Sequence, residues 1–326
     1  MRQEHPPYLA CIMCDSLYIK ANGAMPCWCD AGETLILERL DAGKLAGEGF
    51  DLFNIEPLRL IRRAFHIEGR LPFPEVCRRC CMVEQREAPS SDLEPRRLRL
   101  LHVEPSWLCN LDCPLCIPRD QRKILAAPPH QLDASLWKEV IDNLRRTGVT
   151  QIDTLHFEGK GDPLMHPRLA HLIEAFHGAY PSTPIMVTTN GNFHFDEALF
   201  RSGLRHLRVS VDGARADSYV RYRRLGSWER AYRFMADAAA ARDRLGLPVR
   251  IEWKYILFEW NDSDAEMLEA YELATALGIE LSFCLTPWAG KSRRFDMSTL
   301  DVKIAELAPQ AHNRPTPHLK MDQGAR

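Results

Sequence analysis

Three cysteines within eight residues form the clearest metal-binding pattern of the chain. Cys109, Cys113 and Cys116 have the spacing Cys-x3-Cys-x2-Cys, and they follow a strand expected over residues 100–104. A closed zinc or iron–sulfur site takes four protein ligands, so three thiolates leave one position open. We therefore expect an iron–sulfur cluster with one iron free for another ligand. The alternative is a zinc site that borrows a distant ligand.

A second group of cysteines precedes this trio. Seven of the eleven cysteines lie in the first 95 residues: Cys11, Cys14, Cys27, Cys29, Cys77, Cys80 and Cys81. This segment has few large apolar residues, so a metal centre would supply stability that a small core cannot. The spacings Cys11-x2-Cys14 and Cys77-x2-Cys80 also fit a zinc ribbon, which remains one alternative.

The elements that must position the trio alternate between strands and helices. After a linker at 82–97, strands are expected at 100–104, 152–157, 185–189, 207–211, 249–258 and 279–283, and helices at 133–146, 169–176, 228–244 and 265–276, with a short one from Glu197. Residues 16–20 should form a strand that ends in a hairpin turn at 21–24, and residues 57–65 a helix. Six strand–helix units predict an α/β fold with a parallel sheet, either doubly wound or curled into a partial (β/α)6 TIM barrel. The expected domains are 1–95, 96–290 and a tail or lid at 291–326.

Polar and glycine residues follow the ends of the expected strands. Glu158-Gly-Lys-Gly-Asp-Pro163 follows the second strand, Thr189-Asn190-Gly191 the third, Ser210-Val-Asp212-Gly213 the fourth, and Cys284 the sixth. Each segment taken separately is typical of a turn or a helix cap. In parallel α/β folds, however, ligands bind at the carboxyl ends of strands, so the ordered series predicts a site there.

These motifs together resemble the radical S-adenosylmethionine (SAM) superfamily over residues 98–290. The cysteine spacing matches that family's cluster motif, and residues 159–163 match its glycine-rich motif, with Asp162 where Glu is commoner. Leu115 replaces the usual aromatic residue. The resemblance implies a [4Fe–4S] cluster that binds SAM, reduced by a flavodoxin or ferredoxin. It also implies cofactor contacts from Gly159, Gly161, Asp162, Asn190, Ser210, Asp212 and Arg223.

The N-terminal segment is similar to SPASM or twitch domains, which carry an auxiliary [4Fe–4S] cluster. In those domains the segment usually follows the radical SAM core, whereas here it precedes it. The resemblance implies Cys11, Cys27, Cys77 and Cys80 as ligands. Cys14 could replace Cys11, and Cys29 or Cys81 could enter a second cluster.

Cys284 has three interpretations that the sequence leaves open. It is a buried structural thiol, a hydrogen-atom donor to a substrate radical, or a ligand of the auxiliary centre. The candidates for a general base are Glu104, Glu158, Glu252 and Lys254. The aromatic residues Trp253, Tyr255, Trp260 and Trp288 are expected to belong to the core more often than to a substrate platform.

The resemblance to two-cluster enzymes of aminoglycoside biosynthesis implies a small-molecule substrate. We expect dehydrogenation or epimerisation of a carbon in a sugar or aminocyclitol. In a dehydrogenation, the auxiliary cluster would accept the second electron. The alternatives are a peptide maturase and, in another class, a non-catalytic iron–sulfur or zinc scaffold.

Composition excludes several other classes of protein. The net charge of −2 gives no electrostatic basis for nucleic-acid binding. No apolar run approaches the roughly 18 residues of a membrane span. The polar start of the chain does not resemble a signal peptide, so a cytoplasmic location with reduced thiols is expected.

Overall fold

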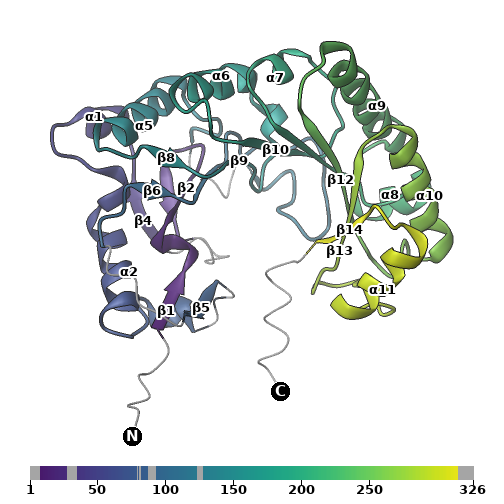
Figure 1. Cartoon of the computed structure of the whole chain (residues 1–326), viewed down its shortest axis with the longest axis horizontal. Helices are drawn as coiled ribbons and strands as arrows, with labels where there is room; N and C mark the ends of the chain where they lie inside the picture. Colours follow the sequence, from purple (N-terminus) through teal and green to yellow (C-terminus); the bar gives the residue numbers. More distant parts are fainter. Residues whose placement is uncertain are drawn as a thin grey trace, which may run out of the picture.

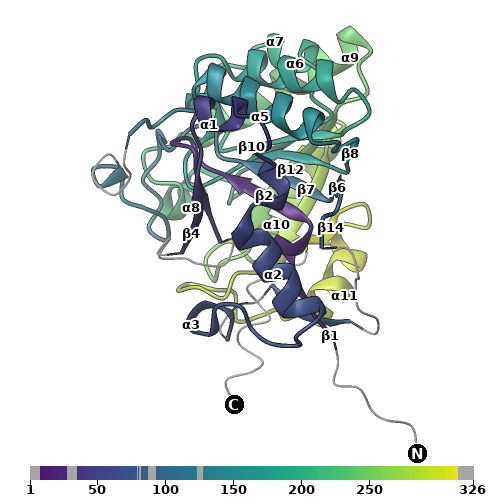
Figure 2. The same cartoon turned by 90° about the vertical axis from the view of Figure 1, so that its left-hand side faces the viewer.

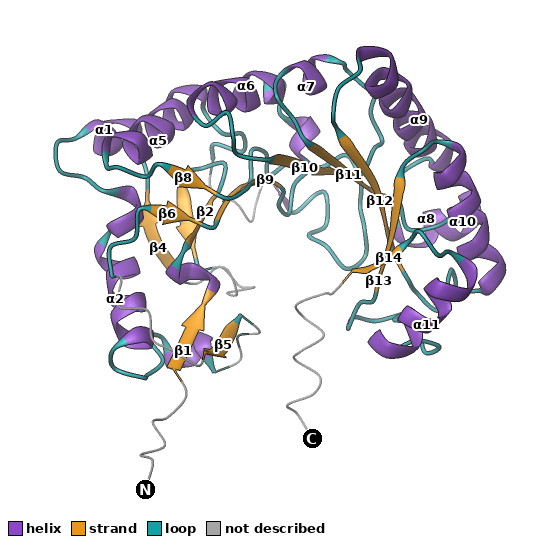
Figure 3. Cartoon of the chain, viewed as in Figure 1, coloured by secondary structure: helices purple, strands orange, loops and turns teal. Residues whose placement is uncertain are grey.

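A curved parallel sheet with helices on its outer face forms the body of the protein. The computed structural model describes residues 8–27, 35–78, 80, 82–86, 93–122 and 128–314. Figure 1 shows the sheet as an arch, and Figure 3 shows the helices lining its convex side. Eight strands pair side by side, all in parallel, in the order in which they occur along the chain: β2 (Ser16–Ile19), β7 (Leu100–Val103), β9 (Leu155–Phe157), β10 (Ile185–Thr189), β11 (His206–Ser210), β12 (Arg250–Ile256), β13 (Glu280–Cys284) and β14 (His312–Arg314).

Seven of the helices that the structure describes follow the first strands of the sheet, and several begin or end at residues that carry capping signals. They are α5 (Ala134–Arg146), α6 (Leu169–Ala179), α7 (Ala198–Arg201), α8 (Ala216–Tyr222), α9 (Trp228–Leu245), α10 (Asp264–Ala276) and α11 (Met297–Leu307). The Asp133 carboxylate accepts the first free N–H groups of α5, and Ser227 and Ser263 do the same for α9 and α10. Gly246, at φ 61°, ends α9 in the left-handed conformation that glycine adopts readily.

The N-terminal segment contributes both to this sheet and to a group of small elements. The small elements are β1 (Tyr8–Cys11), the 3-10 helix η1 (Ile12–Cys14), β3 (Ala24–Pro26), β4 (Ile36–Arg39), α1 (Ala42–Ala46), the 3-10 helix η2 (Leu52–Asn54), α2 (Glu56–His66), α3 (Pro74–Cys77) and β5 (Val83–Arg86). β1 pairs with β5 and β3 with β4, both antiparallel. In the turned view, β1, α2 and α3 lie at the bottom, away from α5 and α6 (Figure 2).

The predicted α/β fold with a parallel sheet is confirmed, and two local predictions are wrong. The predicted strand at 152–157 is split into β8 (Gln151–Ile152), which pairs with β6 (Arg97–Leu98), and β9. The turn at Gly23 forms, yet it does not join two strands of a hairpin. Instead β2 pairs with β7, because Leu17 and Ile19 are fully buried and that position covers them.

The segment after residue 290, expected as a tail or lid, contains α11 and β14, and β14 extends the sheet. At the other edge, β2 of the predicted 1–95 domain belongs to the same sheet. The domain boundaries themselves stay a prediction. Within the described part of the chain, no helix has the length and apolarity that crossing a membrane requires.

The two faces of the sheet differ in chemistry. On β12, Ile251, Trp253 and Tyr255 are buried in the apolar core. The alternate positions Glu252 and Lys254 face the concave side, since strand side chains alternate in direction. Barrel interiors of this type are usually filled with Val, Ile and Leu. A polar concave face is therefore a feature that packing alone does not require.

Candidate functional site

A pocket of about 200 Å³ lies at the carboxyl ends of the strands, and most of the predicted site residues line it. Those residues are Cys109, Cys113, Cys116, Gly159, Gly161, Asp162, Asn190, Ser210 and Arg223. They come from the loops after β7, β9 and β10, from the end of β11 and from the loop after α8. The structure therefore brings together residues that are up to 114 positions apart in the sequence (Cys109 to Arg223).

The three cysteines differ in exposure. Cys109 and Cys113 are half-buried, and Cys116 is exposed. Burial raises the pKa of Cys109, and it raises the pKa of Cys113 to about 11. Arg122, which the sequence did not single out, donates from Nη2 to the Cys116 sulfur at 3.2 Å and from Nη1 to the Lys160 carbonyl at 2.6 Å. The Arg122 charge partly opposes the rise in the pKa of Cys109, and the thiolate is the form that binds metal.

Among the residues that the structure describes, no three Cys, His, Asp or Glu side chains converge as ligands of a single metal ion would. The cysteine trio lines one pocket without meeting at one point. In an iron–sulfur cluster each thiolate binds a different iron atom, so its ligands need not converge. Three thiols that line one pocket are compatible with the open-site cluster that the sequence predicts.

The Asp162 carboxylate joins the loops after β9 and β10. It accepts hydrogen bonds from Leu164 N at 2.9 Å, Thr189 Oγ1 at 2.9 Å and Asn190 N at 2.8 Å. Burial raises its pKa to about 6, although these donors oppose the shift. The carboxylate therefore has a structural task in addition to the cofactor contact that the sequence predicted, and that contact stays a prediction.

Gly159 and Gly161 are needed by the protein's own packing. A Cβ at Gly161 would lie 1.9 Å from the Ser106 carbonyl oxygen, and a Cβ at Gly159 would lie 2.5 Å from Glu104 Cγ. Gly161 N also donates to Glu104 Oε1 at 3.0 Å. The sequence analysis assigned both glycines to close approach of the cofactor. In the structure, both glycines also leave room for Glu104 and Ser106, which follow β7.

Asp212 and Arg223 form a buried ion pair behind the pocket. Arg223 Nε lies 2.6 Å from Asp212 Oδ2, and Asp212 Oδ1 accepts from Ile256 N at 2.7 Å. Asp212 is fully buried and does not line the pocket, whereas Arg223 does. Asp212 is thus placed to position Arg223. Asn190 donates from Nδ2 to Asn110 Oδ1 at 2.8 Å and lies against the Cys109 sulfur.

Four polar residues of the concave face, Glu158, Thr188, Ser210 and Lys254, form what we call the pocket floor. Thr188 donates to Glu158 at 3.0 Å. Burial would raise the pKa of Glu158, but nearby Lys254 and other cationic groups outweigh it and lower that pKa to about 2. The floor therefore presents both a carboxylate and an ammonium group to the pocket.

Of the four candidate bases, Glu158 and Lys254 line the pocket, whereas Glu104 and Glu252 do not. Glu252 is buried, accepts from Ser282 Oγ at 2.6 Å and pairs with Arg208 Nε at 3.0 Å. Glu104 is buried and accepts from Gly161 N. Only the first two are placed to meet a substrate in this pocket.

Cys284 is buried at the end of β13, beside Ile256 of β12. Ile256 lines the pocket and Cys284 does not, so its role as a hydrogen donor stays a prediction. Trp253 and Tyr255 are core residues whose polar atoms bond to backbone carbonyls. Trp288 is 53% exposed.

The N-terminal cysteines lie in the small elements beside the sheet. Cys11, Cys14, Cys27 and Cys77 are buried, and Cys80 is partly buried. A hydrogen bond with Cys14, together with burial, raises the pKa of Cys11 well above its usual value. The same hydrogen bond lowers the pKa of Cys14 to about 5. Cys29 and Cys81 lie outside the described residues.

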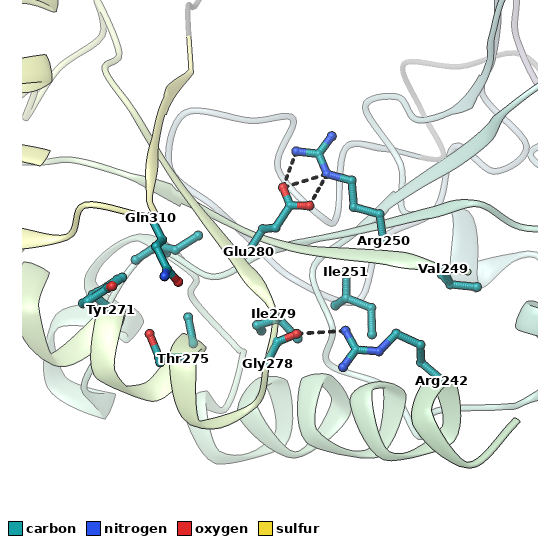
Figure 4. A pocket seen from close by; sticks show the side chains of 12 residues that line it. Arg242, Val249, Arg250, Ile251, Tyr271, Thr275, Gly278, Ile279, Glu280 and Gln310 are labelled. Atoms are coloured by element: carbon teal, nitrogen blue, oxygen red, sulfur yellow. Dashed lines mark hydrogen bonds and ion pairs between the residues drawn. The ribbon is translucent and has the colours of Figure 1, made fainter. Parts of the chain in front are cut away.

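A larger pocket of about 580 Å³ lies at the other end of the sheet, where β12 and β13 begin (Figure 4). Its charged groups are engaged with protein atoms: Arg250 pairs with Glu280, and Arg242 Nη1 donates to the Gly278 carbonyl at 2.9 Å. None of the predicted site residues lines it. The pocket that holds the cysteine trio is therefore the candidate active site.

Comparisons with known proteins show which family this chain is similar to. GTP 3',8-cyclase from Alkaliphilus oremlandii (strain OhILAs) is 27% identical over 237 residues, which is 69% of this chain and 70% of that protein. GTP 3',8-cyclase from Synechococcus sp. (strain CC9605) is 30% identical over 210 residues, 59% of this chain and 58% of that protein. Against others of these cyclases the chain spans only about half of their length.

Among solved structures, a radical SAM methyltransferase from Sphaerobacter thermophilus shares the fold. It has a TM-score of 0.50 and 19% identity, covering 68% of this chain and 67% of its own. The family model of the radical SAM superfamily matches residues 103–286, more than half of the chain. The chain therefore belongs to the radical SAM superfamily.

Proposed function

We propose that this radical SAM enzyme removes a hydrogen atom from a sugar carbon of a small, polar, negatively charged substrate. The observation that carries the proposal is Lys254. Its ammonium group lines the pocket without a hydrogen bond or ion pair to any described residue, although its charge acts on Glu158. Charged groups in such a pocket are normally paired, so an anionic group of the substrate is the fitting partner.

The other charges around the pocket already have protein partners. Arg223 pairs with Asp212, and Arg122 donates to backbone carbonyls. Arg208, behind the floor, pairs with Glu252, and Lys160 Nζ lies over the Trp107 ring at 5.9 Å from its centroid. Lys254 thus differs from these four cations, and together with Glu158 it offers a substrate one cation and one acceptor.

When a [4Fe–4S] cluster and SAM are bound, reductive cleavage of SAM supplies a 5′-deoxyadenosyl radical. The superfamily resemblance supports the Cys109, Cys113 and Cys116 thiolates as cluster ligands. It also supports Asn190, Ser210 and Arg223 as contacts of the cofactor. Asp212 would hold the Arg223 guanidinium in place, and Asp162 would hold the loop that bears Asn190. A flavodoxin or ferredoxin would deliver the electron.

Two outcomes for the substrate radical follow from different observations. Dehydrogenation or epimerisation of a sugar or aminocyclitol follows from the resemblance to aminoglycoside enzymes, and dehydrogenation would use the auxiliary cluster as acceptor of the second electron. The names of the matched relatives favour a second candidate, cyclisation of GTP or a similar nucleotide. GTP contains a sugar and an anionic group, so the pocket floor suits both candidates. A peptide maturase has no comparable support, and an assembled pocket argues against a non-catalytic scaffold.

The experiment is anaerobic incubation of the reduced, cluster-loaded protein with SAM. Formation of 5′-deoxyadenosine is expected for the protein and not for the Cys113→Ala variant. If the protein with an intact cluster forms none, the enzymatic proposal is wrong.

Substrates deuterated on ring carbons then separate the candidates. GTP deuterated on its ribose and phosphorylated aminocyclitols are compared for transfer of deuterium into 5′-deoxyadenosine. The product distinguishes the outcomes: dehydrogenation removes two hydrogen atoms, and epimerisation in D2O adds one solvent deuterium to carbon. Cyclisation of the nucleotide forms a second covalent bond between its sugar and its base. Transfer only from uncharged substrates would contradict the role given to Lys254.

A further inference from the structure

A row of polar side chains crosses the concave face next to the pocket floor. In the register of the sheet, Thr188 of β10 lies beside Arg208 of β11, and Arg208 lies beside Glu252 of β12. Glu158, which follows β9, extends the row, since its carboxylate accepts the hydroxyl of Thr188. Lys254 comes two residues after Glu252 on β12, so both side chains point to the same face of the sheet. The row therefore passes one step along β12 from Lys254.

Arg208 is a buried cation between two carboxylates of this row. Its side chain is 6% exposed, with Nε 3.0 Å from Glu252 Oε2 and Nη1 3.7 Å from Glu158 Oε2. Glu252 is itself fixed, because Ser282 Oγ donates to its Oε1 at 2.6 Å. A guanidinium carries several donors in one rigid plane, so a single arginine can reach both carboxylates. Arg208 therefore connects Glu158, which lines the pocket, to a carboxylate that does not.

The contacts of the Glu158 carboxylate with described side chains fall on Oε2. Thr188 Oγ1 donates to that oxygen at 3.0 Å, and the Arg208 guanidinium lies on the same side. Lys254 makes no ion pair with this carboxylate, although its charge acts on it. Opposite charges in one pocket attract each other. The separation therefore indicates that Thr188 and Arg208 hold Glu158 in place.

We propose that Arg208 is a positioning residue of the pocket floor. It holds the Glu158 carboxylate away from Lys254 and thereby leaves the Lys254 ammonium group for an anionic group of the substrate. The role toward the substrate rests on the proposed function, whereas the link among the three side chains does not. The proposal also narrows the substrate class. The substrate carries an anionic group and, near it, a hydroxyl or amino group that can donate to Glu158.

Without Arg208, the floor would work against an anionic substrate. A carboxylate repels a bound anion, and a closed pair of Glu158 with Lys254 would neutralise the cation that attracts it. Nearby cations, Arg208 among them, lower the pKa of Glu158 to about 2, so the carboxylate stays charged at neutral pH. Such a group accepts hydrogen bonds well and is a weak base. Arg208 offsets its charge from outside the pocket.

The first test needs no substrate. The rate at which acetic anhydride acetylates Lys254 at fixed pH is measured in the cluster-loaded protein by peptide mass spectrometry. An amine held in an ion pair reacts more slowly, so Arg208→Met, which lets Glu158 pair with Lys254, should lower this rate about 10-fold. Combining Arg208→Met with Glu158→Gln removes the competing carboxylate. The rate should then return to within about 2-fold of wild type.

Two controls separate positioning from a loss of stability. Arg62→Met removes another buried arginine, which donates to the Phe53 carbonyl at 2.8 Å and does not line the pocket. It should lower the urea midpoint of unfolding without changing the acetylation of Lys254. Arg208→Lys keeps the charge but has one nitrogen for two carboxylates, so its rate should fall between those of wild type and Arg208→Met.

The second test concerns the anionic group of the substrate. Inorganic pyrophosphate serves as the probe in calorimetric titrations of the unreduced, cluster-loaded protein. Binding that disappears in Lys254→Gln is assigned to the pocket floor. Its dissociation constant should rise roughly 10-fold in Arg208→Met and recover when Glu158→Gln is added.

Two results would overturn the proposal. One is equal acetylation of Lys254 in wild type and Arg208→Met, and the other is a slow rate that Glu158→Gln does not restore. If Arg208→Met does not fold, Arg208→Lys with and without Glu158→Gln decides the question by the same comparison. Rescued acetylation without any binding of pyrophosphate at Lys254 would refute the anionic substrate of the proposed function and leave the positioning role standing.

Discussion

Gly161→Ala tests whether the glycine-rich loop after β9 is constrained by the protein rather than by the cofactor. The new Cβ would lie 1.9 Å from the Ser106 carbonyl oxygen and 2.7 Å from two further backbone carbon atoms. No side-chain rotation relieves contact between backbone atoms, so the loop after β7 or the loop after β9 must move. Overpacking typically costs about 1–3 kcal/mol, and a clash with backbone places this variant near about 3 kcal/mol.

The assay is urea unfolding of the cluster-free protein, followed by circular dichroism. The matched control is Gly178→Ala on α6, where a new Cβ meets nothing within 4 Å. Because alanine favours a helix over glycine, this control should gain roughly 0.5–1 kcal/mol. Gly161→Ala should fall well below wild type even without cofactor. A Gly161→Ala protein as stable as wild type, with only SAM binding impaired, would refute the reasoning.

Three further perturbations probe the ion pair, the concave face and the pocket floor. Asp212→Asn leaves the Arg223 guanidinium buried without its counter-charge. The free energy of unfolding, measured by urea titration, should therefore fall by about 3–5 kcal/mol. Unchanged stability would contradict the pairing. Burial lowers the pKa of His102 from 6.5 to about 4 in the folded protein. The neutral buried imidazole is therefore tolerated above pH 6.5. As the pH falls to 4, protonation of the unfolded chain lowers the free energy of unfolding by about 3 kcal/mol. His102→Leu should flatten that part of the stability profile, whereas the exposed His171→Leu should not. Lys254→Gln should weaken binding of an anionic substrate by roughly 10- to 100-fold while leaving SAM cleavage without substrate intact, and Lys254→Arg should recover much of the loss.

The sequence predicted the parts of the fold that local patterns encode. The strand at Ile185–Thr189 and the helix capped by Asp133 are found where they were predicted, since apolar periodicity and a capping carboxylate are local signals. The pairing of β2 with β7 was missed because it joins residues 84 positions apart, Ser16 with Leu100. A local turn signal at Gly23 was therefore mistaken for a hairpin.

The site was predictable to the extent that strand ends converge in a parallel sheet. Arg122 was missed because it belongs to no periodic pattern or motif. No sequence signal indicates that its guanidinium lies beside Cys116. Asp212 was assigned to the cofactor from its motif. Its burial behind Arg223 depends on packing that the motif does not show.

The pairing of β2 with β7 sets the separation between the pocket and Cys14 of the N-terminal segment. Cys14 lies just before β2, and the pocket lies beyond the opposite end of β7, its parallel neighbour. Four strand residues span about 13 Å, so a centre at Cys14 is too far away to touch a substrate at Lys254. Any electron exchanged between them must tunnel through protein. The edge-to-face contact of Tyr18 with His102, whose ring centroids are 4.7 Å apart, lies along that route. The strand pair would thus act as a spacer that permits electron transfer and forbids direct ligation of the substrate.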